Sequence, residues 1–162
     1  MKLKTLALAS MIAVASTGAI ANDVITNPAV IGGTAYFGAL HTDNVDFTDV
    51  FTFNVAGPVK ANSSMITIGS GLQNIDFIWA DLNGAALTLS PNGFVEFGSI
   101  GDTWLAGPLV LTVKGKSAAA GGTFASYSGT MNVTAVPEPE TYAMMLAGLG
   151  IVGFLARRRR SV

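Results

Sequence analysis

The sequence predicts an all-β fold for residues 22–136, an antiparallel β-sandwich of jelly-roll type, flanked by an N-terminal signal helix and a C-terminal transmembrane helix. Within this range turn residues recur about every 8–12 positions, and no long apolar pattern of helical period lies between them. Long apolar runs occur only near the two ends of the chain. The chain has no cysteine, so the domain is expected to be stabilised by burial instead of disulfides.

Eight strands are expected from alternation and turn signals. The clearest places Phe47, Asp49 and Phe51 on one face and threonines on the other. Asn83-Gly84 is the strongest hairpin signal. The expected strands cover residues 35–40, 46–55, 64–68, 75–82, 86–89, 94–97, 109–114 and 123–134.

The charge of the domain excludes some functions. Residues 22–136 hold eight acidic and three basic side chains, a net charge of −5, whereas the whole chain carries −1. Without a basic patch we expect no nucleic-acid partner. The lack of cysteine excludes thiolate metal sites, and a single histidine, His41, excludes two-histidine metal motifs. We assign no catalytic and no cofactor-binding residue, and we expect that the protein is not an enzyme.

Asp49 is unusual because it stands between phenylalanines on an apolar face. We expect it to accept hydrogen bonds from backbone N–H groups or to lie at the rim of the sandwich, since an unpartnered buried carboxylate is costly. The alternative is a calcium site built from Asp43, Asp46 and Asp49, with Asn44 nearby, although the spacing fits no EF-hand loop. His41 is expected in a solvent-facing loop.

The aromatic residues leave a carbohydrate-binding module open as an alternative function. Trp79 alternates with core positions and is expected to be buried, whereas Trp104 lies in loop-like sequence and is the better platform for a sugar ring. Tyr36 and Tyr127 are further candidates. A hydrolase is a remote alternative, which would need two facing carboxylates in a pocket.

The N-terminus has the three parts of a secretory signal peptide. Lys2 and Lys4 give the positive segment, residues 6–14 the apolar segment, and Ala19 and Ala21 the small-x-small cleavage site. We therefore assign residues 1–21 to the signal peptide and expect Asn22 to begin the mature protein.

The last 26 residues, 137–162, form a three-part tail that begins directly after Val136. Pro137, Glu138 and Pro139 open an extended acidic segment at residues 137–140. The apolar run at residues 141–156 is expected to be a short transmembrane helix of about 24 Å, against a hydrocarbon core of about 30 Å. A basic plug follows, consisting of Arg157, Arg158, Arg159 and Arg160. Four arginines are expected to stay on the cytoplasmic side because their transfer through the bilayer is costly.

This tail resembles the PEP-CTERM sorting signal of Gram-negative bacteria. The resemblance implies export through the inner membrane, transient anchoring there, processing by an exosortase, and a final place at the cell surface or outside the cell. It also implies association with exopolysaccharide and biofilm matrix. Phe47-Thr48-Asp49-Val50-Phe51 resembles the motif that names the F-x-D-x-F group of this family. Together these features predict a non-enzymatic surface or matrix protein, whose ligand the sequence does not identify.

Overall fold

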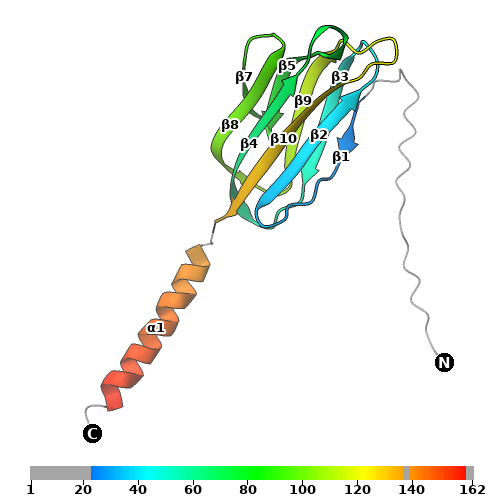
Figure 1. The fold of residues 1–162 in the computed structure, drawn as a ribbon. Coiled ribbons are helices and arrows are strands. Elements are labelled where there is room, and N and C mark those ends of the chain that lie inside the picture. The colour runs from blue at the N-terminus through cyan, green and yellow to red at the C-terminus, as the bar shows by residue number, and fades with distance from the viewer. Residues whose placement is uncertain (1–22, 137–138, 160–162) are drawn as a thin grey trace, which may run out of the picture.

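The computed structural model describes residues 23–136 and 139–159 (Figure 1). Residues 23–136 form two β-sheets, and one C-terminal helix follows them. The predicted signal helix, the cleavage site at Ala19 and Ala21, the sorting residues Pro137 and Glu138, and Arg160 lie outside the described residues.

Each sheet has five strands. The first sheet has the order β1 (Ile25–Thr26), β3 (Asp46–Phe53), β9 (Leu109–Ser117), β5 (Ile75–Leu82) and β6 (Ala85–Ala86). The second has the order β2 (Thr34–His41), β10 (Ala125–Ala135), β4 (Pro58–Ile68), β8 (Val95–Ala106) and β7 (Thr88–Leu89). A 3₁₀ turn at Gly71–Gln73 precedes β5. All neighbours pair antiparallel except β1 and β3, which are parallel. The predicted mostly-β architecture of two sheets is confirmed.

The core lies between the two sheets. Alternate residues of each long strand are buried, which is the pattern expected when one face of a sheet packs on another. Phe51 of β3 and Phe37 of β2 meet across the sandwich with ring centroids 5.0 Å apart. Leu109 and Leu111 of β9 are fully buried beside them. The predicted inward face of residues 46–55 is therefore correct.

Several strand boundaries differ from those expected. β4 begins at Pro58 instead of Ser64, and β8 continues to Ala106 instead of ending near Phe97. The pairing of β4 with β8 shifts its register between Ala61 and Ser63, where β8 carries one extra residue. The alternation of buried and exposed residues therefore breaks in β8, at residues 101–102, and is kept in β4. The two-residue strand β1 was not predicted, because so short a segment carries no periodic signal.

The hairpin predicted at Asn83-Gly84 is confirmed. Both residues have positive φ, 49° and 84°, as a two-residue turn of this kind requires. The Gly84 N–H donates to Asp81 Oδ2 at 2.6 Å, and the side chain of Asn83 bonds to the backbone of Val110 and Pro108. These contacts fix the link between β5 and β6.

The helix α1 spans Pro139–Arg159 and so includes the predicted helical run. Within the described residues, however, no helix combines the length and the apolar character needed to cross a membrane. The expected transmembrane span at residues 141–156 is thus not supported. Its apolar run is only sixteen residues long and is bounded by Glu140 and Arg157.

Candidate functional site

Asp49 is the centre of a buried polar cluster between the sheets. Its side chain is fully buried. One oxygen, Oδ1, accepts a bond of 2.7 Å from the Val24 N–H. The other, Oδ2, accepts from the Tyr127 hydroxyl at 2.5 Å and lies 3.0 Å from His41 Nε2. Asp49 therefore accepts a backbone bond, as predicted, but two side chains that the sequence did not connect to it supply the rest.

His41 is not a solvent-facing loop residue, as the sequence analysis expected. It ends β2 and is fully buried. Its ring stacks on Phe47 with centroids 3.9 Å apart and an interplanar angle of 17°. Because a carboxylate only accepts, we assign the ring proton to Nε2, and Nδ1 then has no partner among the described residues. His41 lies inside because residues 35, 37, 39 and 41 share the buried face of β2.

Tyr127 closes the cluster from the opposite sheet. Burial, and then the negative charge of Asp49, raises the pKa of the Tyr127 hydroxyl far above its ordinary value. The hydroxyl is therefore protonated near neutral pH and donates to Asp49. Its ring meets Phe77 and Phe51 edge-on. Together with the bond from His41 of β2, this bond joins the second sheet to Asp49 of the first sheet through two hydrogen bonds to one carboxylate oxygen.

Asp49 also binds the N-terminal segment of the described domain. Besides the Val24 bond, Val50 N–H donates to Val24 O at 2.8 Å and Thr48 N–H donates to Asp23 Oδ1 at 2.7 Å. These bonds dock the segment before β1 against β3. The F-x-D-x-F sequence thus supplies two core rings and one acceptor for the N-terminal segment.

The candidate calcium ligands are not brought together. Asp43 and Asp46 are exposed, whereas both oxygens of Asp49 are occupied inside the core. Over residues 23–136 and 139–159 no three His, Cys, Asp or Glu side chains form a group that could hold a metal ion. Calcium binding stays a prediction that no observation here supports.

Glu96 is a second buried carboxylate. Its oxygens accept from the Phe77 N–H at 2.9 Å and the Gly93 N–H at 3.0 Å, which ties β5 to the turn before β8. Burial raises the pKa of Glu96 above its usual 4.5, and the nearby Asp76 carboxylate adds to this, while the two N–H donors oppose it. The side chain of Glu96 has no exposed surface. Glu96 therefore lies inside the domain, where both of its oxygens accept from backbone N–H groups.

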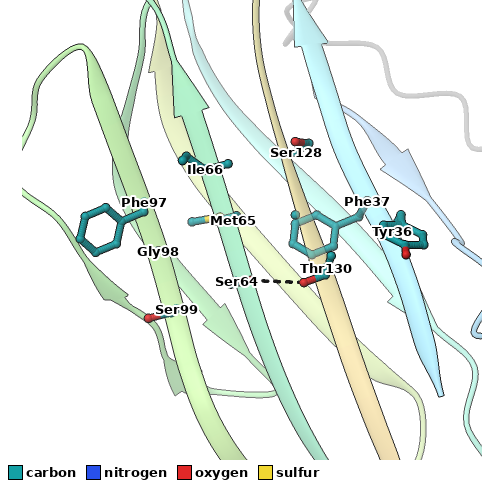
Figure 2. Close-up of a pocket in the computed structure, with 11 residues that line it drawn as sticks. Tyr36, Phe37, Ser64, Met65, Ile66, Phe97, Gly98, Ser99, Ser128 and Thr130 are labelled. Carbon is teal, nitrogen blue, oxygen red and sulfur yellow. Dashed lines mark hydrogen bonds between the residues drawn. The ribbon is translucent and has the colours of Figure 1, made fainter.

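A groove of about 480 Å³ crosses the outer face of the second sheet (Figure 2). Strands β2, β10, β4 and β8 supply its lining in register. Two cross-strand rows supply its exposed side chains: Tyr36, Thr130, Ser64 and Ser99, then Ser128, Ile66 and Phe97. Tyr36 and Phe97 are 76% and 54% exposed at opposite sides of the groove. The width across these four strands is about 14 Å, since neighbouring strands lie about 4.8 Å apart.

Hydroxyl groups lie between the aromatic sides of the groove. Ser64 and Thr130 bond to each other at 3.2 Å, and among the described residues the hydroxyls of Ser99 and Ser128 have no hydrogen-bond partner. No charged side chain lines the groove. Its surface therefore offers apolar rings and neutral donors and acceptors. The pairing of β10 with β2 and β4 places the hydroxyls of Ser128 and Thr130 in line with Tyr36 and Ile66, which no local sequence pattern indicates.

The next row of the same face differs because its polar groups bond to one another. Thr34 donates to Asn132, Asn132 to Asn62, and Asn62 to Asp102, with distances of 3.0, 3.0 and 2.7 Å. These side chains lie on β2, β10, β4 and β8, and they form hydrogen bonds with one another. It borders the groove and contributes rigidity to the sheet rather than free donors.

Both tryptophans lie where the sequence analysis did not place them. Trp104 is 62% exposed but belongs to β8, and Lys60 Nζ lies 5.0 Å from its ring centroid. Trp79 is 42% exposed instead of buried, with Lys114 Nζ at 5.5 Å. A register shift between Phe77 and Trp79 turns the latter outward. In each case a cation already occupies one face of the indole ring.

Comparisons with known proteins identify the tail. No curated protein matches the chain. Among solved structures, the pre-peptidase C-terminal domain of a collagenase from Bacillus anthracis is similar over 69% of this chain and 96% of its own, at 14% identity and a TM-score of 0.37. The resemblance of residues 47–51 to the F-x-D-x-F group is not confirmed. Residues 135–160, however, match the family of the PEP-CTERM protein-sorting motif, and the chain thus carries the sorting signal of an exported exosortase substrate.

Proposed function

We propose that the protein is a non-enzymatic component of the cell surface or extracellular matrix, delivered there by its PEP-CTERM tail. The sorting motif at residues 135–160 carries this proposal. It begins where β10 ends, at Ala135, so the sandwich is complete before the tail starts. The tail can then be processed without breaking a strand.

The character of the sandwich supports a non-catalytic role. Its two buried carboxylates, Asp49 and Glu96, are occupied by hydrogen bonds inside the domain. The groove, by contrast, is lined by neutral side chains without an acid, base or nucleophile in an activating contact. An aromatic and hydroxyl surface of this type binds more readily than it catalyses.

Replacing Pro137, Glu138 and Pro139 with alanine tests the sorting proposal. We expect the variant chain to stay in the envelope fraction at its unprocessed mass, because the extended segment presented to the exosortase is lost. Pro108→Ala, outside the tail, is the control and should be sorted like the parent. Unchanged release of the triple variant would show that the tail does not direct sorting. Sequencing of the released protein should give Asn22 as the first residue.

A second candidate function is the binding of a neutral glycan in the groove on the second sheet. Aromatic rings of Tyr36 and Phe97 can stack on the apolar faces of sugar rings, and the hydroxyls of Ser99 and Ser128 are free to bond to sugar hydroxyls. The absence of charge in the groove lining favours a neutral polymer over an acidic one.

A glycan array probed with the full chain tests this second function. Tyr36→Ala and Phe97→Ala should each lower binding by about tenfold, if each ring contributes about 1–1.5 kcal/mol. Trp104→Ala is the matched control, since Trp104 is an exposed aromatic on the same sheet but does not line the groove. A loss of binding in the Trp104 variant alone would place the sugar at the other end of the face.

A further inference from the structure

The four sheet edges of the described domain are not alike. Three of them end in strands of only two residues, β1, β6 and β7. Short edge strands are a common protection against pairing with another chain, because they present few free backbone groups. The fourth edge is β2, which has eight residues and pairs only with β10. Strand β2 is thus the longest of the four edge strands.

Strand β2 lacks the other usual protections as well. Its sequence, Thr-Ala-Tyr-Phe-Gly-Ala-Leu-His, contains no proline, lysine, arginine or carboxylate. Within the described residues, its backbone bonds outside the β10 pairing involve only Thr34, which bonds to Ile31 at the start of the strand. The buried side chains Phe37 and His41 hold the strand straight against the core. The free edge is therefore both long and preorganised.

We propose that β2 is an assembly edge, at which two copies of this chain pair antiparallel, β2 to β2, into one ten-stranded sheet. The register places Gly38 opposite Gly38 of the second copy. Tyr36 then faces Leu40 of the other chain on the outer face, twice by symmetry, and aromatic–aliphatic pairs of this kind stabilise cross-strand contacts. Both residues are exposed in the single chain, 76% and 52%.

The symmetry of this pairing suits the rest of the molecule. A twofold axis perpendicular to the sheet keeps both outer faces on the same side, so the two grooves lie next to each other across the new seam. Because β10 runs antiparallel to β2, the C-terminal ends of the two β10 strands leave at opposite ends of the joined sheet. The helices that follow therefore do not obstruct one another. The proposal is independent of the sorting function and of what the groove binds.

Cysteine cross-linking tests the register directly, because the chain has no cysteine of its own. Full-length Tyr36→Cys and Leu40→Cys chains with different tags are co-expressed and exported together. Across the seam the two Cα atoms would lie about 5 Å apart, which a disulfide can bridge. Within one chain positions 36 and 40 are about 13 Å apart and cannot be bridged. We expect a disulfide-linked dimer that contains both tags, and little cross-linking when either variant is expressed alone.

The control pairs Tyr36→Cys with Ile68→Cys. Ile68 is 73% exposed on the outer face of the same sheet, but it belongs to the interior strand β4. This pair should not cross-link above the background of chance collision. Absence of the 36–40 link, or equal linking of 36 with 68, overturns the proposal, whether the chain is monomeric or associates through another face. Gly38 is left unchanged because an added Cβ would lie 2.6 Å from the Tyr127 carbonyl oxygen.

A charge exchange at the same positions gives a second readout by analytical sedimentation. Tyr36→Lys with Leu40→Lys places like charges opposite each other twice and should weaken association about tenfold or more. Tyr36→Glu with Leu40→Lys removes the same apolar area but creates two opposite-charge pairs, and should associate like the parent. Equal behaviour of the two double variants would show that Tyr36 and Leu40 do not face each other, and the proposed register would fail.

Discussion

The interior cluster around Asp49 and the groove on the second sheet are both rich in polar groups, but they use them in opposite ways. Both carboxylate oxygens of Asp49 accept hydrogen bonds inside the domain, from Val24, His41 and Tyr127. In the groove, the Ser99 and Ser128 hydroxyls face solvent without a partner among the described residues. A satisfied buried polar group holds a fold together, whereas an exposed unsatisfied one is available to a ligand. In this domain the polar groups that stabilise the fold thus lie apart from the exposed hydroxyls that have no partner among the described residues.

The largest effect is expected for Asp49→Ala. Loss of the carboxylate leaves two buried donors, on His41 and Tyr127, and the half-buried Val24 N–H without an acceptor. Removal of one partner of a buried charged network costs about 3–5 kcal/mol. Urea unfolding of the full chain measures the change. Ser128→Ala in the groove is the matched control and should stay within about 0.5 kcal/mol of the parent.

The same two variants, measured with and without calcium, test the alternative role of Asp49. A structural Asp49 gives the same loss of stability in both conditions. If calcium instead raises the melting temperature of the parent but not that of Asp49→Ala, Asp49 is a metal ligand and the contrast between the two regions is wrong.

Tyr127→Phe isolates one bond of the cluster. The ring stays in the core and only the hydroxyl that donates to Asp49 is removed, so we expect a loss of about 1.5–3 kcal/mol, the range for a hydrogen bond to a charged group. Thermal unfolding followed by circular dichroism checks this. Tyr36→Phe, the exposed counterpart at the groove, should leave the melting temperature unchanged. A similar loss of stability in both variants would mean that the hydrogen bond from Tyr127 to Asp49 does not stabilise the fold more than an exposed hydroxyl does.

Glu96→Gln is expected to change how stability depends on pH. The pKa of Glu96 is raised in the folded domain, so the folded state disfavours its ionised form. Its contribution is fully present below the ordinary pKa of 4.5 and is lost as pH rises through the folded value. The free energy of unfolding of the parent should therefore fall relative to that of the glutamine variant as pH increases above about 4.5. Parallel pH profiles of the two proteins would contradict this.

The smallest effect on stability is expected for Ser64→Ala. Its hydroxyl shares a bond of 3.2 Å with Thr130 at the exposed floor of the groove, so the change should be within about 0.5 kcal/mol. Glycan binding by the second candidate function should nevertheless decrease, because a floor hydroxyl is lost. A large loss of stability would place this residue with the structural polar groups of the interior.

Features that depend on residues close together in the chain could be predicted from the amino-acid sequence. Alternation over residues 46–53 predicted which side chains of β3 face inward, because side-chain direction along a strand is a local property. Asn83-Gly84 predicted the hairpin, because the positive φ of its turn is also a local property. The sorting motif in the tail could also be predicted, because it is defined by the order of its segments along the chain.

Contacts between residues that are far apart in the chain could not be predicted in this way, because they depend on how the two sheets pack. Tyr127 and Asp49 are 78 positions apart and lie in different sheets, and the packing of one sheet on the other brings them together. A single register shift moved Trp79 from the core to the surface, and the burial of His41 followed from a strand that continued one residue further than expected. Strand partners, bulges and the open edge at β2 are set by long-range packing and backbone pairing. The free energy of packing and of strand pairing depends on contacts throughout the domain, so a local sequence pattern does not indicate them.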